Sequence, residues 1–168
     1  MKTVIIIPAR YASSRFPGKP LAALKLADGS RKSLIELSWE AAKQVQGISE
    51  VYVATDDDRI RNAAIEFGAE VIMSSSNCAN GTERCAEALE NAKLDADLVI
   101  NLQGDAPLTP PWFIEALIDA MRNDPAAQMV TPVLQVDPMT YGLFTEDRRN
   151  GRVGGTTAVF DRSNNALY

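Results

Sequence analysis

Three cations gather in one segment near the start of the chain, where they could bind phosphate. Pro8–Lys19 follows directly on the apolar run Val4–Ile7 and contains Arg10, Arg15 and Lys19 with no acidic residue. Arginine presents a planar fork of hydrogen-bond donors and lysine a compact charge, so both suit the oxygens of a polyphosphate. A solvated basic loop is the alternative interpretation.

The distribution of charge favours phosphate binding. The chain has 17 Lys and Arg against 22 Asp and Glu, a net charge of −5. Its first 27 residues contain five cations and no carboxylate, so the other 141 residues sum to −10. A nucleic-acid surface needs basic residues spread over a face, so we expect no nucleic-acid partner. Gly18–Pro20 lacks the Ser or Thr of a Walker A loop and no GxGxxG sequence occurs, which argues against kinase-like and dinucleotide sites.

A second candidate segment follows the predicted strand Leu98–Leu102. Asp105 lies in a turn beside Gly104, where its carboxylate could reach a magnesium ion that bridges phosphates. The alternative is that Asp105 only stabilises the turn. Gln103 has both a donor and an acceptor for sugar hydroxyls, although a turn-stabilising Gln would have the same sequence. The basic segment elsewhere in the chain favours the magnesium interpretation of Asp105.

Two further groups of charged residues have less specific patterns. Arg84 lies in the first turn of a predicted helix, where the helix dipole disfavours a cation, so a ligand or partner could hold it there. The alternative is a surface charge cluster with Glu83 and Glu87. Asp56–Asp58 are expected to cap a helix, since acids at a helix start usually do so, and we assign them no chemistry.

Composition excludes several other classes of protein. The absence of histidine rules out Ser-His-Asp and Cys-His catalysis and argues against zinc. Cys78 and Cys85 are too few for a disulfide framework and are expected to be a loop thiol and a core residue. No apolar run is long enough to cross a bilayer and no secretory signal is evident, so we expect a cytoplasmic protein without a membrane partner.

The periodicity of apolar residues predicts alternating strands and helices in a single domain, residues 1–168. The expected strands are Val4–Ile7, Val51–Thr55, Val71–Met73, Leu98–Leu102, Met129–Val136 and Thr156–Phe160. The expected helices are Leu34–Gln46, one after Asp56–Asp58 that ends at Gly68, one with Cys85 on its inner face, and one capped by Thr109. Pro138–Gly155 is expected to be a surface excursion. This order predicts an α/β fold, a mostly parallel sheet between two helix layers.

In such sheets ligands bind outside the carboxyl ends of the strands. The basic segment and Gln103–Pro107 must both emerge there. The sequence therefore predicts that these two segments converge on one edge of the sheet.

Four segments together resemble the 3-deoxy-manno-octulosonate cytidylyltransferase (CMP-KDO synthetase) family. They are Ile7–Leu21, Val53–Asp56, Asn80–Arg84 and Leu102–Asp105, and the resemblance covers nearly the entire chain. It implies a nucleotide-diphospho-sugar transferase fold of Rossmann-like type and a homodimer. It also implies conversion of CTP and KDO, a 2-keto-3-deoxy sugar acid, into CMP-KDO and pyrophosphate for lipopolysaccharide synthesis. The sugar's anomeric hydroxyl would attack the α-phosphate directly, with Mg²⁺ as cofactor.

The resemblance also assigns roles to individual residues. The residues that would hold the CTP phosphates are Arg10, Ser14, Arg15 and Lys19. Those that would frame the nucleoside are Pro8, Ala9, Gly81, Thr82 and Arg84. Gln103 would face the sugar and Asp105 would be the magnesium ligand, so Arg10, Lys19 and Asp105 are the expected catalytic groups.

The chain departs from the family at three places. Ala106 stands where members usually have Glu, and Thr157 where they tend to have Lys. The chain ends at Tyr168, before the last third of a typical member, so we expect a C-terminally incomplete nucleotidyltransferase domain. Two alternatives follow: a CTP-binding or assembly module without turnover, and activation of another sugar such as a sialic acid or 8-amino-KDO.

Overall fold

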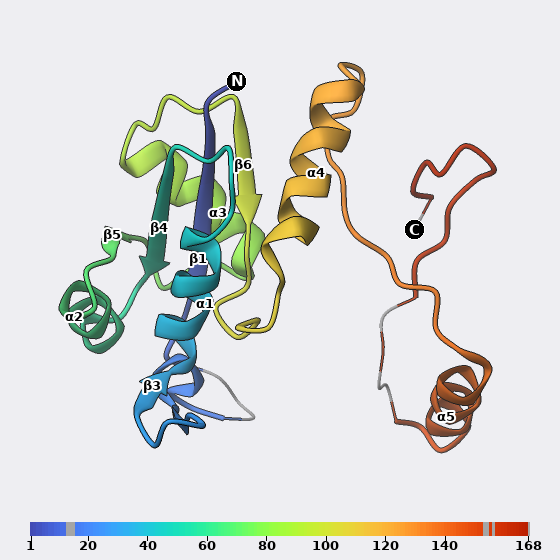
Figure 1. The fold of residues 1–168 in the computed structure, drawn as a ribbon, viewed down its shortest axis with the longest axis horizontal. Helices are drawn as coiled ribbons and strands as arrows, with labels where there is room; N and C mark the ends of the chain where they lie inside the picture. Colours follow the sequence, from blue (N-terminus) through green and yellow to red (C-terminus); the bar gives the residue numbers. More distant parts are fainter. Residues whose placement is uncertain (13–15, 153–154, 156, 168) are drawn as a thin grey trace. The chain divides into compact units, whose positions relative to one another are not determined.

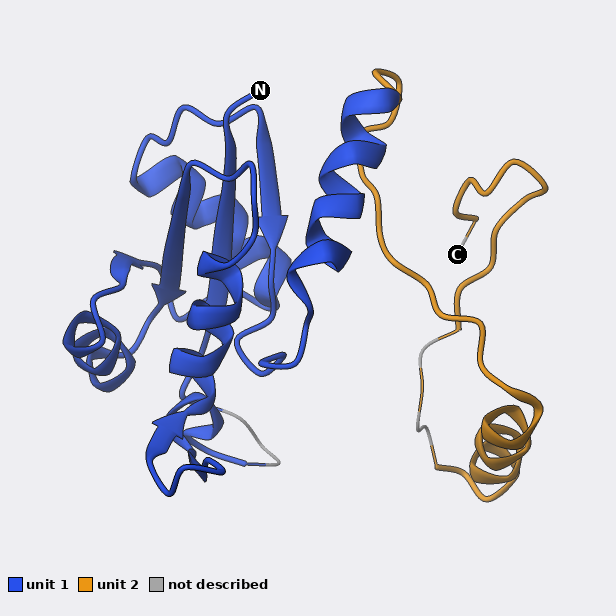
Figure 2. Cartoon of the chain, viewed as in Figure 1, with its two compact units in different colours: residues 1–123 blue, residues 124–168 orange. Residues whose placement is uncertain are grey.

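The computed structural model describes residues 1–12, 16–152, 155 and 157–167. The chain divides into two compact units, Met1–Asn123 and Asp124–Tyr168 (Figure 2). Every described residue that the sequence analysis assigned to the site lies in the first unit. Ser14 and Arg15 lie outside the described residues.

The first unit is built on a parallel sheet (Figure 1). Its strands are β1 (Thr3–Ala9), β4 (Glu50–Thr55), β5 (Glu70–Met73) and β6 (Leu98–Asn101). Their order across the sheet is β5-β4-β1-β6, and β1 pairs in parallel with both β4 and β6. Since all four strands run in the same direction, their carboxyl ends share one edge, as the sequence predicts.

Successive side chains of β1 are buried on opposite faces of the sheet. Ile5 and Ile7 belong to one apolar cluster, and Val4 and Ile6 to another. The first cluster is completed by α1 (Leu34–Lys43), α2 (Asp58–Glu66) and α4 (Pro111–Asn123), and the second by α3 (Gly81–Asn91). Helices therefore cover both faces, which confirms the predicted three-layer α/β/α arrangement.

The helices next to the sheet edge begin at polar caps. The Ser33 side chain accepts a hydrogen bond from the Glu36 amide at the start of α1. Asp57 caps α2, which confirms the expected capping role for this residue of the acidic run, whereas Asp56 instead pairs with Arg84. Asn80 accepts from the Glu83 amide at 2.9 Å and so caps α3. These caps satisfy amide groups that have no partner inside the helix.

A small hairpin between the basic segment and α1 has no counterpart in the sequence prediction. It consists of β2 (Ala23–Lys25) and β3 (Arg31–Ser33), which pair antiparallel. A 3-10 helix, η1 (Lys19–Leu21), precedes it. Three-residue strands are too short to show a clear alternation, so periodicity could not indicate them.

In the second unit the expected strand at Met129–Val136 is wrong. Those residues have no regular secondary structure, and Leu134 is 80% exposed. Pro132 lacks the amide hydrogen that a central strand needs, and no strand pairs with this segment within the described part of the chain. An apolar run without a partner strand cannot form a ladder.

Two other expectations for this unit are corrected. Pro138–Arg149 forms helix α5 instead of an irregular excursion, although no α5 residue is buried. Asp137 accepts from the Thr140 amide at 2.7 Å and proline occupies the first helical position, a helix-start pattern that the sequence analysis missed. The described part of the expected strand at Thr156–Phe160 forms only an isolated bridge from Phe160 to Ala166.

None of the helices within the described ranges combines the length and apolar character needed to cross a membrane.

Candidate functional site

The segments after β1 and β6 lie against each other at the carboxyl edge of the sheet. Pro8 and Ala9 are buried in the last two positions of β1. A Cβ atom on Gly104 would lie 3.1 Å from the Pro8 carbonyl oxygen and 3.0 Å from Ile35 Cδ1. The Gly104 carbonyl in turn accepts a hydrogen bond from the buried Ser38 hydroxyl at 3.1 Å. This close approach favours glycine at position 104, in the turn that carries Asp105.

Lys19 and Asp105 form an ion pair at this edge. The Lys19 ammonium donates a hydrogen bond to Asp105 Oδ2, although 86 residues separate the two in sequence. Their side chains are 45% and 43% exposed. The expected convergence of the basic segment and the Gln103–Pro107 turn is therefore present in the structure. Arg10 lies exposed immediately after β1.

The start of α3 packs against the same edge. A Cβ atom on Gly81 would lie 3.1 Å from Pro8 Cγ and 3.3 Å from Gln103 Nε2. The absence of a side chain at Gly81 thus lets the helix approach the end of β1. Three residues assigned from the resemblance, Pro8, Gly81 and Gln103, are brought together here.

A chain of side-chain hydrogen bonds links β6 to α3. Gln103 Nε2 donates to Asn101 Oδ1 at 2.9 Å, and Asn101 Nδ2 donates to Thr82 Oγ1 at 3.4 Å. Asn101 therefore orients both Gln103 and Thr82, and the sequence analysis missed it. The signal was available, because Asn101 is a polar residue at the end of the apolar run Leu98–Ile100.

Arg84 is buried instead of facing solvent. Its side chain is 3% exposed, and its guanidinium lies 3.4 Å from Asp56 Oδ1. It also donates to the Ser74 hydroxyl and to the Ser75 carbonyl, the latter at 3.3 Å. Asp56 directly follows β4 and Ser74 directly follows β5, so Arg84 ties the ends of two strands to the first turn of α3.

The surface charge cluster considered for Arg84 is therefore wrong. Glu83 accepts a hydrogen bond from the Ala79 amide at 2.7 Å, as part of the cap of α3. Glu87 accepts from the Ser75 amide and from the Cys78 thiol. Both carboxylates serve the loop before α3, which the local sequence could not reveal.

Neither cysteine has the character of a nucleophile. Burial raises the pKa of the Cys85 thiol to about 12. The hydrogen bond to Glu87, followed by burial, raises the pKa of Cys78. Both thiols remain protonated at neutral pH, in keeping with the expected loop and core roles.

The donor set at the edge suits a magnesium ion that shares its ligands with phosphates. Mg²⁺ is commonly held by one or two carboxylates plus substrate phosphates and water. Asp105 offers one half-exposed carboxylate beside the basic segment. No cluster of three acidic or cysteine ligands occurs among the residues that the structure describes. Asp105 fits magnesium delivered with a nucleotide.

Known proteins are similar to this chain in sequence and in fold. A family model described as cytidylyltransferase matches residues 4–142. The 3-deoxy-manno-octulosonate cytidylyltransferase of Maricaulis maris is 45% identical over 168 residues, covering 100% of this chain and 63% of that protein. The 8-amino-3,8-dideoxy-manno-octulosonate cytidylyltransferase of Shewanella frigidimarina is 42% identical over 170 residues, covering 100% of this chain and 64% of that protein.

A solved structure of CMP:2-keto-3-deoxy-manno-octonic acid synthetase complexed with CTP matches with a TM-score of 0.77 and 37% identity. The match covers 100% of this chain and 63% of that one, so this chain spans less than two thirds of the length of these relatives. The similarity confirms the predicted fold class. Together with the family match over residues 4–142, it shows that the chain belongs to the cytidylyltransferase family.

Proposed function

We propose that this chain provides the CTP-binding part of a sugar cytidylyltransferase. The enzyme would transfer CMP from CTP to KDO or a related 2-keto-3-deoxy sugar acid and release pyrophosphate, in lipopolysaccharide precursor synthesis. The observation that carries the proposal is the meeting of Lys19 with Asp105 at the carboxyl edge of the sheet. The names of the relatives and of the CTP complex support the choice of nucleotide and sugar.

In this reaction the anomeric hydroxyl of the sugar attacks the α-phosphorus of CTP. The new bond joins the sugar oxygen to that phosphorus, the bond to the β-phosphate oxygen breaks, and the hydroxyl proton is released to water. Charge develops on the departing pyrophosphate, and the cations Arg10 and Lys19 would neutralise it. No covalent bond to the protein is required, so the residues act by positioning and by charge.

The Lys19–Asp105 pair suggests how the site receives its nucleotide. Both side chains are half-exposed, and each neutralises the other in the structure described here. When Mg²⁺ is bound with CTP, it would polarise the phosphate oxygens, and Asp105 would hold it. Lys19 would then bind the phosphates in place of Asp105. The exchange costs little because exposed ion pairs are weak.

A CTP-binding or assembly module without turnover is the second candidate function. It is favoured by Ala106 at the edge of the site. Activation of 8-amino-KDO is an alternative within the enzyme class, supported by the relative from Shewanella frigidimarina. Activation of a sialic acid and a homodimer stay predictions from the resemblance, and a cytoplasmic location stays a prediction from the composition.

Pyrophosphate release distinguishes these candidates. The 168-residue chain would be incubated with CTP, Mg²⁺ and, separately, KDO, 8-amino-KDO and a sialic acid. Release with one sugar supports the enzyme and identifies its substrate. CTP binding in calorimetry without release from any sugar would favour the module, and absence of both would contradict the proposal.

A further inference from the structure

Within the basic segment, Gly18 contacts Tyr11. The Gly18 amide donates to the Tyr11 carbonyl oxygen at 2.9 Å. Gly18 has a left-handed backbone with φ +71°, and a Cβ atom there would lie 2.9 Å from Tyr11 Cε2. The Tyr11 ring therefore lies directly against Gly18, the residue before Lys19. Any movement of the ring would be transmitted to the start of η1.

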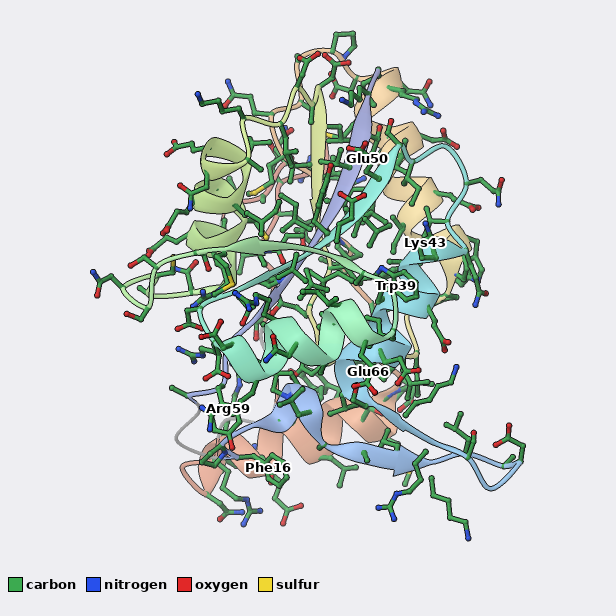
Figure 3. All side chains as sticks on the ribbon, turned by 90° about the vertical axis from the view of Figure 1, so that its left-hand side faces the viewer. Phe16, Trp39, Lys43, Glu50, Arg59 and Glu66 are labelled. Atoms are coloured by element: carbon green, nitrogen blue, oxygen red, sulfur yellow. The ribbon has the colours of Figure 1, made fainter. Side chains whose placement is uncertain are left out.

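The Tyr11 ring is held from a different part of the chain. The Arg59 guanidinium carbon lies 3.2 Å from the ring centroid, close enough for a cation–π contact. Arg59 is itself held by Asp57, through Nε to Oδ1 at 2.9 Å and Nη2 to Oδ2 at 2.6 Å. Figure 3 shows Arg59 beside the segment that carries Phe16. A continuous series of contacts thus runs from the cap of α2 to Lys19.

From these contacts we infer that Arg59 and Tyr11 are positioning residues for Gly18 and Lys19 at the end of the basic segment, an inference that rests on the proposed function. The planar guanidinium, fixed by two hydrogen bonds to Asp57, holds the Tyr11 ring against Gly18. This fixes the backbone from which the Lys19 side chain reaches Asp105. A Lys19 backbone held in this way loses less conformational freedom when Lys19 binds a polyphosphate, so affinity rises without any contact from Arg59 to the ligand.

Removal of the ring without a change in charge is the first test. We expect Tyr11→Leu to weaken Mg²⁺–CTP binding about two- to fivefold in calorimetry, the size of an exposed cation–π contact. Tyr11→Phe retains the ring and should bind Mg²⁺–CTP as tightly as wild type does. Hydrogen exchange of the Gly18 amide should be faster in Tyr11→Leu and unchanged in Tyr11→Phe. Equal CTP affinity in Tyr11→Leu and wild type would overturn the inference.

Asp57→Asn separates positioning from a simple effect of charge. Asn caps helices as well as Asp, so α2 should remain intact, while the ion pair to Arg59 is lost. The variant has one negative charge fewer, so a field effect alone would tighten CTP binding. Positioning predicts weaker binding, and tighter binding would contradict it.

A matched control lies on α1. Lys43 lies over the Trp39 ring at 5.8 Å from its centroid, a contact of the same kind away from the basic segment (Figure 3). Lys43→Gln should leave CTP affinity unchanged, and a loss equal to that of Tyr11→Leu would contradict the inference. If wild type itself binds no CTP, the proposed function fails. If wild type binds and the Tyr11 and Asp57 variants bind equally well, only this inference fails.

Discussion

Two ion pairs at the carboxyl edge of the sheet differ sharply in their surroundings. Lys19 and Asp105 are 45% and 43% exposed, whereas the side chains of Arg84 and Asp56 are 3% and 15% exposed. An exposed pair can exchange its partners for a ligand at little cost, but a buried pair cannot be broken without leaving a charge in a low-dielectric environment. The first pair is therefore suited to binding and the second to holding the edge together.

The largest expected effect concerns the buried pair. Arg84→Met should lower the free energy of unfolding by about 3–5 kcal/mol, because Asp56 would keep a buried charge without its partner. Denaturant unfolding measures the change. The double variant Arg84→Met/Asp56→Leu should recover part of the loss, since it removes both charges. A loss below about 1 kcal/mol in the single variant would contradict the structural role of this pair.

Loss of a partner in the exposed pair should affect CTP binding more than it affects the stability of the fold. Lys19→Ala should weaken Mg²⁺–CTP binding by about 1.5–3 kcal/mol, the size of a hydrogen bond to a charged group. Its free energy of unfolding should change by less than about 1 kcal/mol. Calorimetry and denaturant unfolding on the same samples test both parts. Unchanged affinity with intact folding would remove Lys19 from the site.

A double-mutant cycle measures the exposed pair itself. With Lys19→Ala, Asp105→Ala and the double variant, we expect a coupling of about 0.2–1 kcal/mol in unfolding without nucleotide. Raising the salt concentration should reduce it, because exposed charges are screened. A coupling above about 2 kcal/mol would mean that the pair is as structural as Arg84–Asp56.

The smallest expected effect lies beside the buried pair. The hydrogen bond from Arg59 holds the pKa of Asp57 below its ordinary value of 3.8. The unfolded chain then binds more protons than the folded one. This contribution to stability is therefore complete above about pH 5, begins to fall as the pH approaches 3.8, and is fully lost only below the lower pKa of the folded state. Asp57→Asn should lose less stability than wild type between pH 5 and pH 3 in thermal unfolding. Parallel curves would contradict this assignment.

Apolar runs form strands in the first unit but not in the second. The four strands of the parallel sheet in the first unit are predictable because continuous apolar runs such as Val4–Ile7 are buried on both faces. In the second unit, Met129–Val136 has apolar residues too, but it lies exposed and has no regular structure. Hydrophobicity indicates that a segment could be buried. It does not reveal whether a neighbouring strand is present to pair with it.

For the candidate site, the amino-acid sequence alone predicts the kind of chemistry. The cations of Pro8–Lys19, the Asp105 turn and the alternation of strands and helices were sufficient to predict anion binding at one edge of a parallel sheet. These features are local or periodic, so they can be read along the chain.

Only the tertiary structure determines which charged residues form ion pairs. In the folded chain Lys19 pairs with Asp105 at a half-exposed position, and Arg84 pairs with Asp56 at a largely buried one. Asn101 lies between Gln103 and Thr82 and bonds to both. An ion pair becomes exchangeable or structural according to how much water the surrounding elements exclude. That exclusion depends on the packing of segments far apart in sequence, and no local pattern contains it.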